Sequence, residues 1–283
     1  REAKYQTQLT AYGSLKGALS SFQSAVAALA NPARFSAVTA NLADTTVATA
    51  TASSAAVTGS YAVEVQTLAQ AHKLKSASFA ATSTAVGSGT LTIQFGAYSS
   101  GVFTLNADKA AGTVAIDSSQ SSLAGVRDAI NAANVGVSAS IINDGAGNRL
   151  MVASKDSGIA NALKITVADD DLTHTDTAGL SQLAYDASTG GTTNLTQTVT
   201  AQNAAVVIDG ISISKASNTL TDAIEGVTLN LLKANTPGAT TLTVARDTAG
   251  TQAAVQSFVK AYNDLNKTIT DLSKYDAANK RSS

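Results

Sequence analysis

The sequence of 283 residues predicts an α+β multidomain protein in which both chain ends form an antiparallel helical leg and two nested β-rich head domains lie between them. Large apolar residues recur at both ends in steps of three and four, which marks one face of a helix. The residues between are rich in Ala, Thr, Ser and Gly and alternate as strands do. If the end helices pair, the other domains must be nested, which gives a leg of residues 1–44 and 248–283, a head domain of 45–81 and 192–247, and an inserted outer head domain of 82–191.

The first end segment carries a seam of eight large apolar residues: Tyr5, Leu9, Tyr12, Leu15, Leu19, Phe22, Val26 and Leu29. We expect this helix to end at Asn31–Pro32, because proline disfavours helical geometry in the residue before it. A helix of about 30 residues is about 45 Å long, which is more than one end of a compact domain can cover. The seam therefore needs a partner.

The second end segment repeats this spacing from near Thr251, at Val255, Phe258, Tyr262, Leu265, Ile269 and Leu272. Burial of each large side chain contributes about 1.5–3 kcal/mol, so two paired seams can hold the chain ends together. Two interpretations remain open. The seams either pack on a common intramolecular core, or form an elongated coiled leg that also contacts other subunits.

The first half of the intervening sequence predicts mainly strands. Residues 44–60 indicate a linker or extended segment, residues 61–65 alternate as a strand, and 65–74 continue into an irregular or helical turn. Leu91, Ile93 and Phe95 share one face of a half-buried strand. Two shorter strand candidates are residues 102–105 and 114–116.

A helix, hairpin and strand pattern follows. Leu123, Val126, Ala129 and Ile130 predict a short amphipathic helix, and the strands 135–142 and 149–153 flank a loop at 143–148. In the segment 206–213, Asp209–Gly210 supplies the positive φ of a tight hairpin. The remaining predictions are a polar loop at 169–191, a helical turn at 219–224, and strands at 226–232 and 240–244.

The composition excludes several classes of function. A net charge of −1 lacks the basic surface of a nucleic-acid binder, and no apolar run is long enough to predict a membrane span. Zero cysteines exclude disulfides and thiolate metal sites. No Trp, one Met and 5% aromatic residues leave few side chains for a ligand pocket. Since the sequence begins at Arg1, we also expect it to be a trimmed piece.

Residue types that often carry chemistry do not assemble into a motif. His72 and His174 fall in different predicted domains and lack further ligands for zinc. Asp169–Asp171 lacks the spacing of a calcium loop, and residues 143–148 lack the Lys and the helix of a phosphate-binding loop. No Gly-x-Ser-x-Gly nucleophile elbow occurs. We therefore predict no catalytic residue, no cofactor and no metal site.

Three groups of segments together resemble the flagellar filament cap protein (hook-associated protein 2) family. Residues 59–74, GSYAVEVQTLAQAHKL, look like its N-terminal signature. Residues 122–134, SLAGVRDAINAAN, with 147–153, GNRLMVA, are similar to a repeat shared by flagellin-related hook proteins. Residues 208–213, 217–229 and 258–263 look like its C-terminal part.

The resemblance implies a helical leg, two β-rich heads and a ring-shaped homo-oligomer in the full-length form. It also implies flagellin as a partner, an extracellular location at the flagellum tip, and export through the flagellar secretion channel. An export chaperone is a further candidate partner. From the resemblance we also expect the extreme N- and C-terminal segments of the family to lie outside this sequence.

Three other functions compete with a filament cap. A different hook-associated or flagellin-like axial protein would share the middle repeat. The polar β loops of the head suggest an adhesin for host mucin or other glycans. The third alternative is a secreted hydrolase that uses buried carboxylates.

Overall fold

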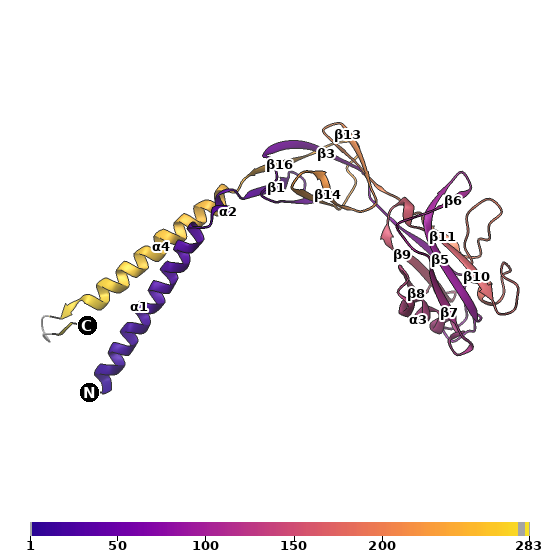
Figure 1. Cartoon of the computed structure of the whole chain (residues 1–283), viewed down its shortest axis with the longest axis horizontal. Coiled ribbons are helices and arrows are strands. Elements are labelled where there is room, and N and C mark those ends of the chain that lie inside the picture. Colours follow the sequence, from indigo (N-terminus) through magenta and orange to yellow (C-terminus); the bar gives the residue numbers. More distant parts are fainter. Residues whose placement is uncertain (1, 277–280, 283) are drawn as a thin grey trace.

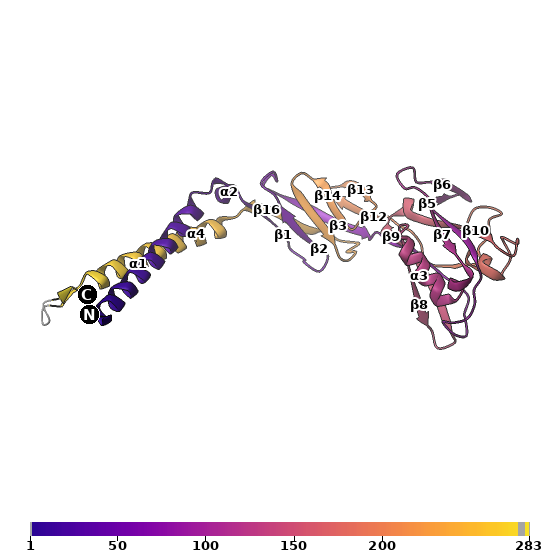
Figure 2. The same ribbon diagram turned by 60° about the horizontal axis from the view of Figure 1, so that its bottom comes forward.

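The computed structural model describes residues 2–276 and 281–282 and shows an elongated molecule with three parts in series (Figures 1 and 2). A helical leg stands at one end, a β-rich domain lies in the middle, and a second β-rich domain forms the far end. Both chain termini lie at the free end of the leg. The predicted α+β fold class and the leg built from both chain ends are confirmed. Arg1, residues 277–280 and Ser283 of the predicted leg lie outside the described residues.

The leg consists of two long helices, α1 (Glu2–Leu29) and α4 (Thr248–Ser273). The short helix α2 (Pro32–Phe35) joins α1 to the middle domain, whereas α4 begins directly after the last strand of that domain. As predicted, α1 ends before Pro32. The Asn31 side chain accepts a hydrogen bond from the Ala33 amide at 3.1 Å and so begins α2. Asp247 does the same for α4, where its carboxylate accepts from the Gly250 amide at 2.8 Å. After α4, the short strands β17 (Tyr275–Asp276) and β18 (Arg281–Ser282) pair with each other.

The middle domain consists of two antiparallel sheets. The first has the order β1-β16-β3-β12-β13 and the second the order β14-β15-β2. The predicted hairpin at Asp209–Gly210 joins β12 to β13. The strands of this domain are β1 (Val38–Leu42), β2 (Ala48–Ala52), β3 (Gly59–Thr67), β12 (Ala204–Ile208), β13 (Ile211–Lys215), β14 (Thr219–Ile224), β15 (Val227–Leu231) and β16 (Thr240–Arg246).

The outer domain packs two four-stranded sheets and one helix around a larger core. One sheet has the order β11-β4-β9-β8; in the other, β5 pairs with β10, β6 and β7. The helix α3 (Leu123–Ala133) buries the four predicted residues of its apolar face. The other elements are β4 (Ala71–Lys75), β5 (Gly89–Ser99), β6 (Val102–Leu105), β7 (Gly112–Ile116), η1 (Ser118–Gln120), β8 (Val137–Asn143), β9 (Asn148–Ser157), η2 (Ile159–Asn161), β10 (Ala162–Asp169), η3 (Gly179–Leu183) and β11 (Thr196–Val199).

Each β-rich domain has its own hydrophobic core. The middle core extends from Ala40 to Ala69 and from Ala204 to Val244, and the outer core from Leu74 to Leu195. The domain boundaries predicted near residues 45, 82, 192 and 248 stay a prediction. Because β1 pairs with β16, and β4 and β11 pair within an outer sheet, we propose that the boundaries lie near residues 37, 70, 201 and 247.

Two local predictions were wrong, and a third is refined by the structure. Residues 219–224 form the strand β14 and not a helical turn, because Thr219 and Leu220 pair with β15. Residues 71–75 form β4, where His72 and Leu74 alternate into the core. The predicted loop at 169–191 contains η3, which buries Leu180 and Leu183. In contrast, the loop at 143–148 is a hairpin connection between β8 and β9, as predicted.

Ser154 in β9 carries the one buried side-chain polar atom without a hydrogen-bond partner among the described residues. A buried hydroxyl without a partner costs about 1–3 kcal/mol. We therefore expect Ser154→Ala to raise the free energy of unfolding by about 1 kcal/mol, measured by urea titration. Ser76 is the matched control, because its equally buried hydroxyl accepts from the Leu150 amide at 2.8 Å. Ser76→Ala should destabilise the outer domain, and a loss of stability in both variants would contradict this account.

Candidate interface on the helical leg

The two leg helices are held together by an aromatic cluster near the middle domain. The ring of Phe22 in α1 lies 5.6 Å from the ring of Phe258 and 6.2 Å from that of Tyr262, both in α4. Tilted aromatic pairs at such distances contribute about 0.5–1.5 kcal/mol beyond the area they bury. These contacts fix the register of the antiparallel pair.

Only part of the predicted seam lies between the helices. The half-buried members are Leu15, Phe22, Leu29, Phe258, Leu265 and Leu272. The positions beside them on the inner face carry small residues that the sequence analysis missed: Ala11, Ala18, Ala25, Ala254 and Ala261. Leucine or phenylalanine therefore alternates with alanine along the contact, and the alanines let the two helices approach closely.

The other eight seam residues are exposed. In α1 they are Tyr5 (70% exposed), Leu9, Tyr12 (73%), Leu19 and Val26, and in α4 Val255, Tyr262 and Ile269. Val259 is exposed as well. Tyr5, Tyr12, Leu19 and Val26 are spaced by seven residues, as are Val255, Tyr262 and Ile269. Each helix therefore carries a second apolar row beside the one that packs inside.

The two exposed rows lie on the same face of the leg. In an antiparallel pair, equivalent heptad positions of the two helices flank the contact on one side. Counting from Phe22 and Phe258, this places Val26 opposite Val255, Leu19 opposite Tyr262, and Tyr12 opposite Ile269. We name these six residues, with Tyr5, Leu9 and Val259, the leg face. The leg therefore resembles a helical bundle in which half of the apolar core is exposed to solvent.

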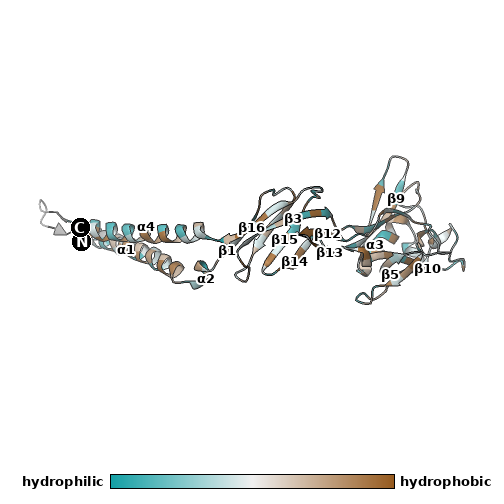
Figure 3. Cartoon of the chain, turned by 90° about the horizontal axis from the view of Figure 1, so that it is seen from above, coloured by the Kyte–Doolittle hydropathy of each residue, from teal (hydrophilic) through white to brown (hydrophobic). Residues whose placement is uncertain are grey.

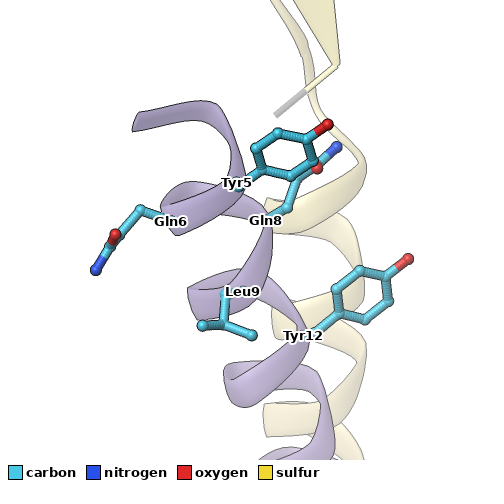
Figure 4. Close-up of a pocket in the computed structure, with 5 residues that line it drawn as sticks. All are labelled: Tyr5, Gln6, Gln8, Leu9 and Tyr12. Atoms are coloured by element: carbon cyan, nitrogen blue, oxygen red, sulfur yellow. The ribbon is translucent and has the colours of Figure 1, made fainter. Parts of the chain in front are cut away.

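The free end of α1 carries the most exposed part of the leg face. Tyr5 and Tyr12 project from the same side of α1, and Leu9 lies between them along the helix (Figure 4). A shallow hollow of about 360 Å³ lies here, lined by Tyr5, Gln6, Gln8, Leu9 and Tyr12. Unlike an enclosed ligand pocket, it lies on the surface of a single helix. It is therefore better suited to receive a side chain from another helix.

Charge distinguishes the two helices. Between Tyr5 and Ala33, Lys16 is the only charged residue, whereas α4 carries hydrophilic residues along its length (Figure 3). Lys260 pairs with Asp264 at 2.7 Å and Lys267 with Asp271 at 2.5 Å. A hydrogen bond from Lys267, with a smaller contribution from Lys274, lowers the pKa of Asp271 to about 2. Because charged residues are depleted in interface cores, α1 is the helix better suited to burial in an assembly.

The residues singled out for chemistry do not come together. His72 is buried at the base of the outer domain, and His174 is exposed in the loop after β10. The carboxylate of Asp169 accepts from the Ser181 amide at 2.7 Å, so it serves the loop. Within residues 2–276 and 281–282, no group of three or more His, Cys, Asp or Glu residues could hold a metal ion. None of the helices described is long and apolar enough to cross a membrane.

A slender helical leg that carries two β-rich domains in series and exposes an apolar face belongs to the class of elongated structural proteins. Three family profiles match successive parts of the chain: the flagellar hook-associated protein 2 N-terminus at residues 1–72, the flagellin hook IN motif at 102–156, and the flagellar hook-associated protein 2 C-terminus at 201–283. The chain belongs to the flagellar hook-associated protein 2 family.

Individual relatives agree with this assignment. The D1-D2-D3 domains of the flagellar cap protein FliD from Escherichia coli are 40% identical, with a TM-score of 0.76 over 95% of this chain and 72% of that one. FliD from Pseudomonas aeruginosa PAO1 is 34% identical, with a TM-score of 0.62 over 79% of this chain and 95% of that one. The flagellar hook-associated protein 2 of E. coli K12 is 40% identical over 98% of this chain and 56% of its own length. The chain thus spans about half the length of the curated relatives it matches.

Proposed function

We propose that this chain is part of a structural, non-enzymatic cap at the distal end of the bacterial flagellar filament, where it assists flagellin polymerisation. Its family is the main support, because solved members from Escherichia coli are described as the flagellar cap protein FliD. The single structural observation that carries the proposal is the leg face, because a free apolar row on a rod-shaped domain needs an assembly partner. Location at the flagellum tip and export through the secretion channel belong to the same proposal.

The mechanism we propose is mechanical. The leg docks at the filament end and packs through its apolar face against neighbouring subunits of a ring-shaped homo-oligomer. The two β-rich domains then form a plate above the filament end, and the space beneath it shelters flagellin subunits as they fold into place. An export chaperone and host mucin or other glycans stay predictions, since they rest on the resemblance and on exposed polar loops alone.

Leu19→Asp tests the proposed interface. Leu19 is 53% exposed, so the substitution should leave the fold of the single chain intact. In an assembled leg it would bury an unpaired carboxylate, and we expect subunit association to weaken at least tenfold, or about 1.4 kcal/mol. Light scattering across a concentration series measures the association. Electron microscopy of cells that lack their own cap protein measures whether the gene for this chain restores filaments.

Ser21→Asp is the matched control. Ser21 is exposed on the same helix but lies on the opposite side from the Leu19 row, so the same charge should leave association and filament growth unchanged. If the Leu19 variant associates as tightly as the wild type, the leg face is not the interface. If it associates weakly and yet builds filaments of normal length, capping does not depend on this contact.

A further inference from the structure

The strands that connect the two β-rich domains pass a buried histidine. The chain crosses from β3 to β4 and returns from β11 to β12, and at the crossing Gln70 and Gln202 form an isolated bridge with amide hydrogen bonds of 2.8 and 3.1 Å. His72 lies two residues beyond Gln70 and is 1% exposed. It therefore stands where the outer domain is attached to the rest of the molecule.

Both ring nitrogens of His72 are used. Nδ1 accepts a hydrogen bond from the Leu163 amide of β10 at 3.0 Å, which requires this nitrogen to carry no proton. Nε2 consequently carries the proton and donates to Oε1 of Gln197 in β11 at 3.2 Å. The Tyr185 hydroxyl donates to the same oxygen at 3.0 Å. One neutral imidazole thus connects β4 with β10 of the other outer sheet and with the returning strand β11.

The surroundings favour the neutral ring. Burial lowers the pKa of His72, and the hydrogen bond to Gln197 opposes this effect in part. Two titratable groups lie beside the ring. They are Tyr185, whose ring centre lies 5.5 Å away, and Tyr98 of β5, which lines a small cavity together with His72. The strand β11 carries no charge. The other elements around His72 also carry charged groups. They are Lys73 and Lys75 on β4, Arg149, Lys155 and Asp156 on β9, Lys164 and Asp169 on β10, and Asp186 after η3, which pairs with Lys164 at 2.7 Å.

If Nδ1 gained a proton, it would become a hydrogen-bond donor that faces another donor, the Leu163 amide. The Leu163 amide would then lose its acceptor, and a charge would be buried among β4, β10 and β11. Beside the ring is a cavity of about 120 Å³, lined in part by Gln197, Thr200 and Ala201 of the returning segment. It offers space into which the ring or this segment can move.

We propose that His72 is a proton-sensitive latch at the base of the outer domain, which joins β4, β10 and β11 while its ring is neutral and releases them when the ring gains a proton. The sign follows from linkage. Because the folded state binds this proton less readily than the unfolded state, the stabilisation is fully present above the unfolded-state pKa of about 6.5 and is lost as the pH falls below it. At acidic pH the outer domain would be held less firmly by the two strands that connect it to the middle domain.

The test compares the wild-type chain with His72→Gln, whose side chain cannot gain a proton, at pH 8, 7, 6 and 5. Urea titration followed through the NMR amide signal of Ile130, in the outer core, measures the ratio of folded to unfolded outer domain. For the wild type we expect this ratio to fall up to tenfold for each pH unit below about 6.5, in excess of any fall in the variant. His174→Asn is the control, because exposed His174 also accepts an amide hydrogen bond at Nδ1, from Asp169 at 3.0 Å. It should keep the wild-type pH dependence, and equal falls in the wild type and His72→Gln would overturn the proposal.

A second measurement needs no variant. In the folded wild-type chain, the NMR signals of the His72 ring and the Leu163 amide should shift together, with a midpoint below pH 6.5. A ring that titrates at or above pH 6.5, or a Leu163 amide signal that stays constant while the ring titrates, would overturn the latch.

Discussion

Phe22→Ala is expected to separate the two leg helices and leave both β-rich domains folded. Phe22 contacts two aromatic rings of α4, and truncation of a fully buried phenylalanine costs about 3–5 kcal/mol. Since Phe22 is only half-buried, we expect the leg to lose about 2–3 kcal/mol. The two β-rich cores contain no residue of α1, and the first buried residue of the middle core, Ala40, lies eleven residues beyond the end of α1 at Leu29. Circular dichroism at 222 nm should therefore show helix loss at a temperature where NMR signals of the β-rich domains persist.

Tyr12→Ala is the control for Phe22→Ala. Tyr12 lies on the same helix but is 73% exposed, so its removal should change the stability of the single chain by less than about 0.5 kcal/mol. Equal loss of helix in both variants would show that the leg face is packed within the chain. Loss of the β-domain signals together with the helix would show that the three parts unfold as one unit.

The sequence predicts that the leg is a pair of helices, but it does not predict which side of each helix faces the other helix. The heptad pattern was drawn from large apolar side chains, and it placed Tyr12 and Leu19 on the same seam as Leu15 and Phe22. The structure instead packs Leu15 and Phe22 beside alanines and turns the other row outward. Close approach of two helices favours small residues, so the alanines repeating every seven residues were the signal that could have found the inner face. A sequence of one chain also contains no information on which apolar row another molecule covers.

In the β-rich domains, too, local sequence alone does not determine the secondary structure. The spacing of Leu220 and Ile224 fits a helical turn as well as it fits a strand, and only pairing with β15 decides the outcome. In β4, a histidine occupies a position that alternation reserves for apolar residues, so the strand was missed. His72 can be buried there because β10 and β11 supply partners for both ring nitrogens. Such long-range hydrogen bonds determine the site and leave no mark on local sequence.

Gly89→Ala is expected to damage the outer domain more than most single substitutions in it. Gly89 begins β5 at the point where this strand pairs with both β7 and β10, and its φ is +141°. An added Cβ would lie 2.3 Å from the Ala168 carbonyl oxygen, which is backbone and cannot rotate away. A disallowed φ alone costs about 1–3 kcal/mol, and the overlap adds about 1–3 kcal/mol more. We therefore expect the free energy of unfolding of the outer domain to fall by about 3 kcal/mol or more in urea titrations.

Gly145→Ala separates the two contributions. Gly145 also has a positive φ, +86°, but no atom lies within 4 Å of an added Cβ, so this variant reports the cost of the backbone conformation alone. If Gly89→Ala destabilises no more than Gly145→Ala, β10 can withdraw from β5 without loss, and the junction of the two strands is looser than the structure shows. A clearly larger effect at Gly89 would mean that the β5–β10 pairing cannot shift. In that case β10, which donates the Leu163 amide to His72, would stay fixed to β5. Any acid-induced loosening would then be confined to the connecting strands.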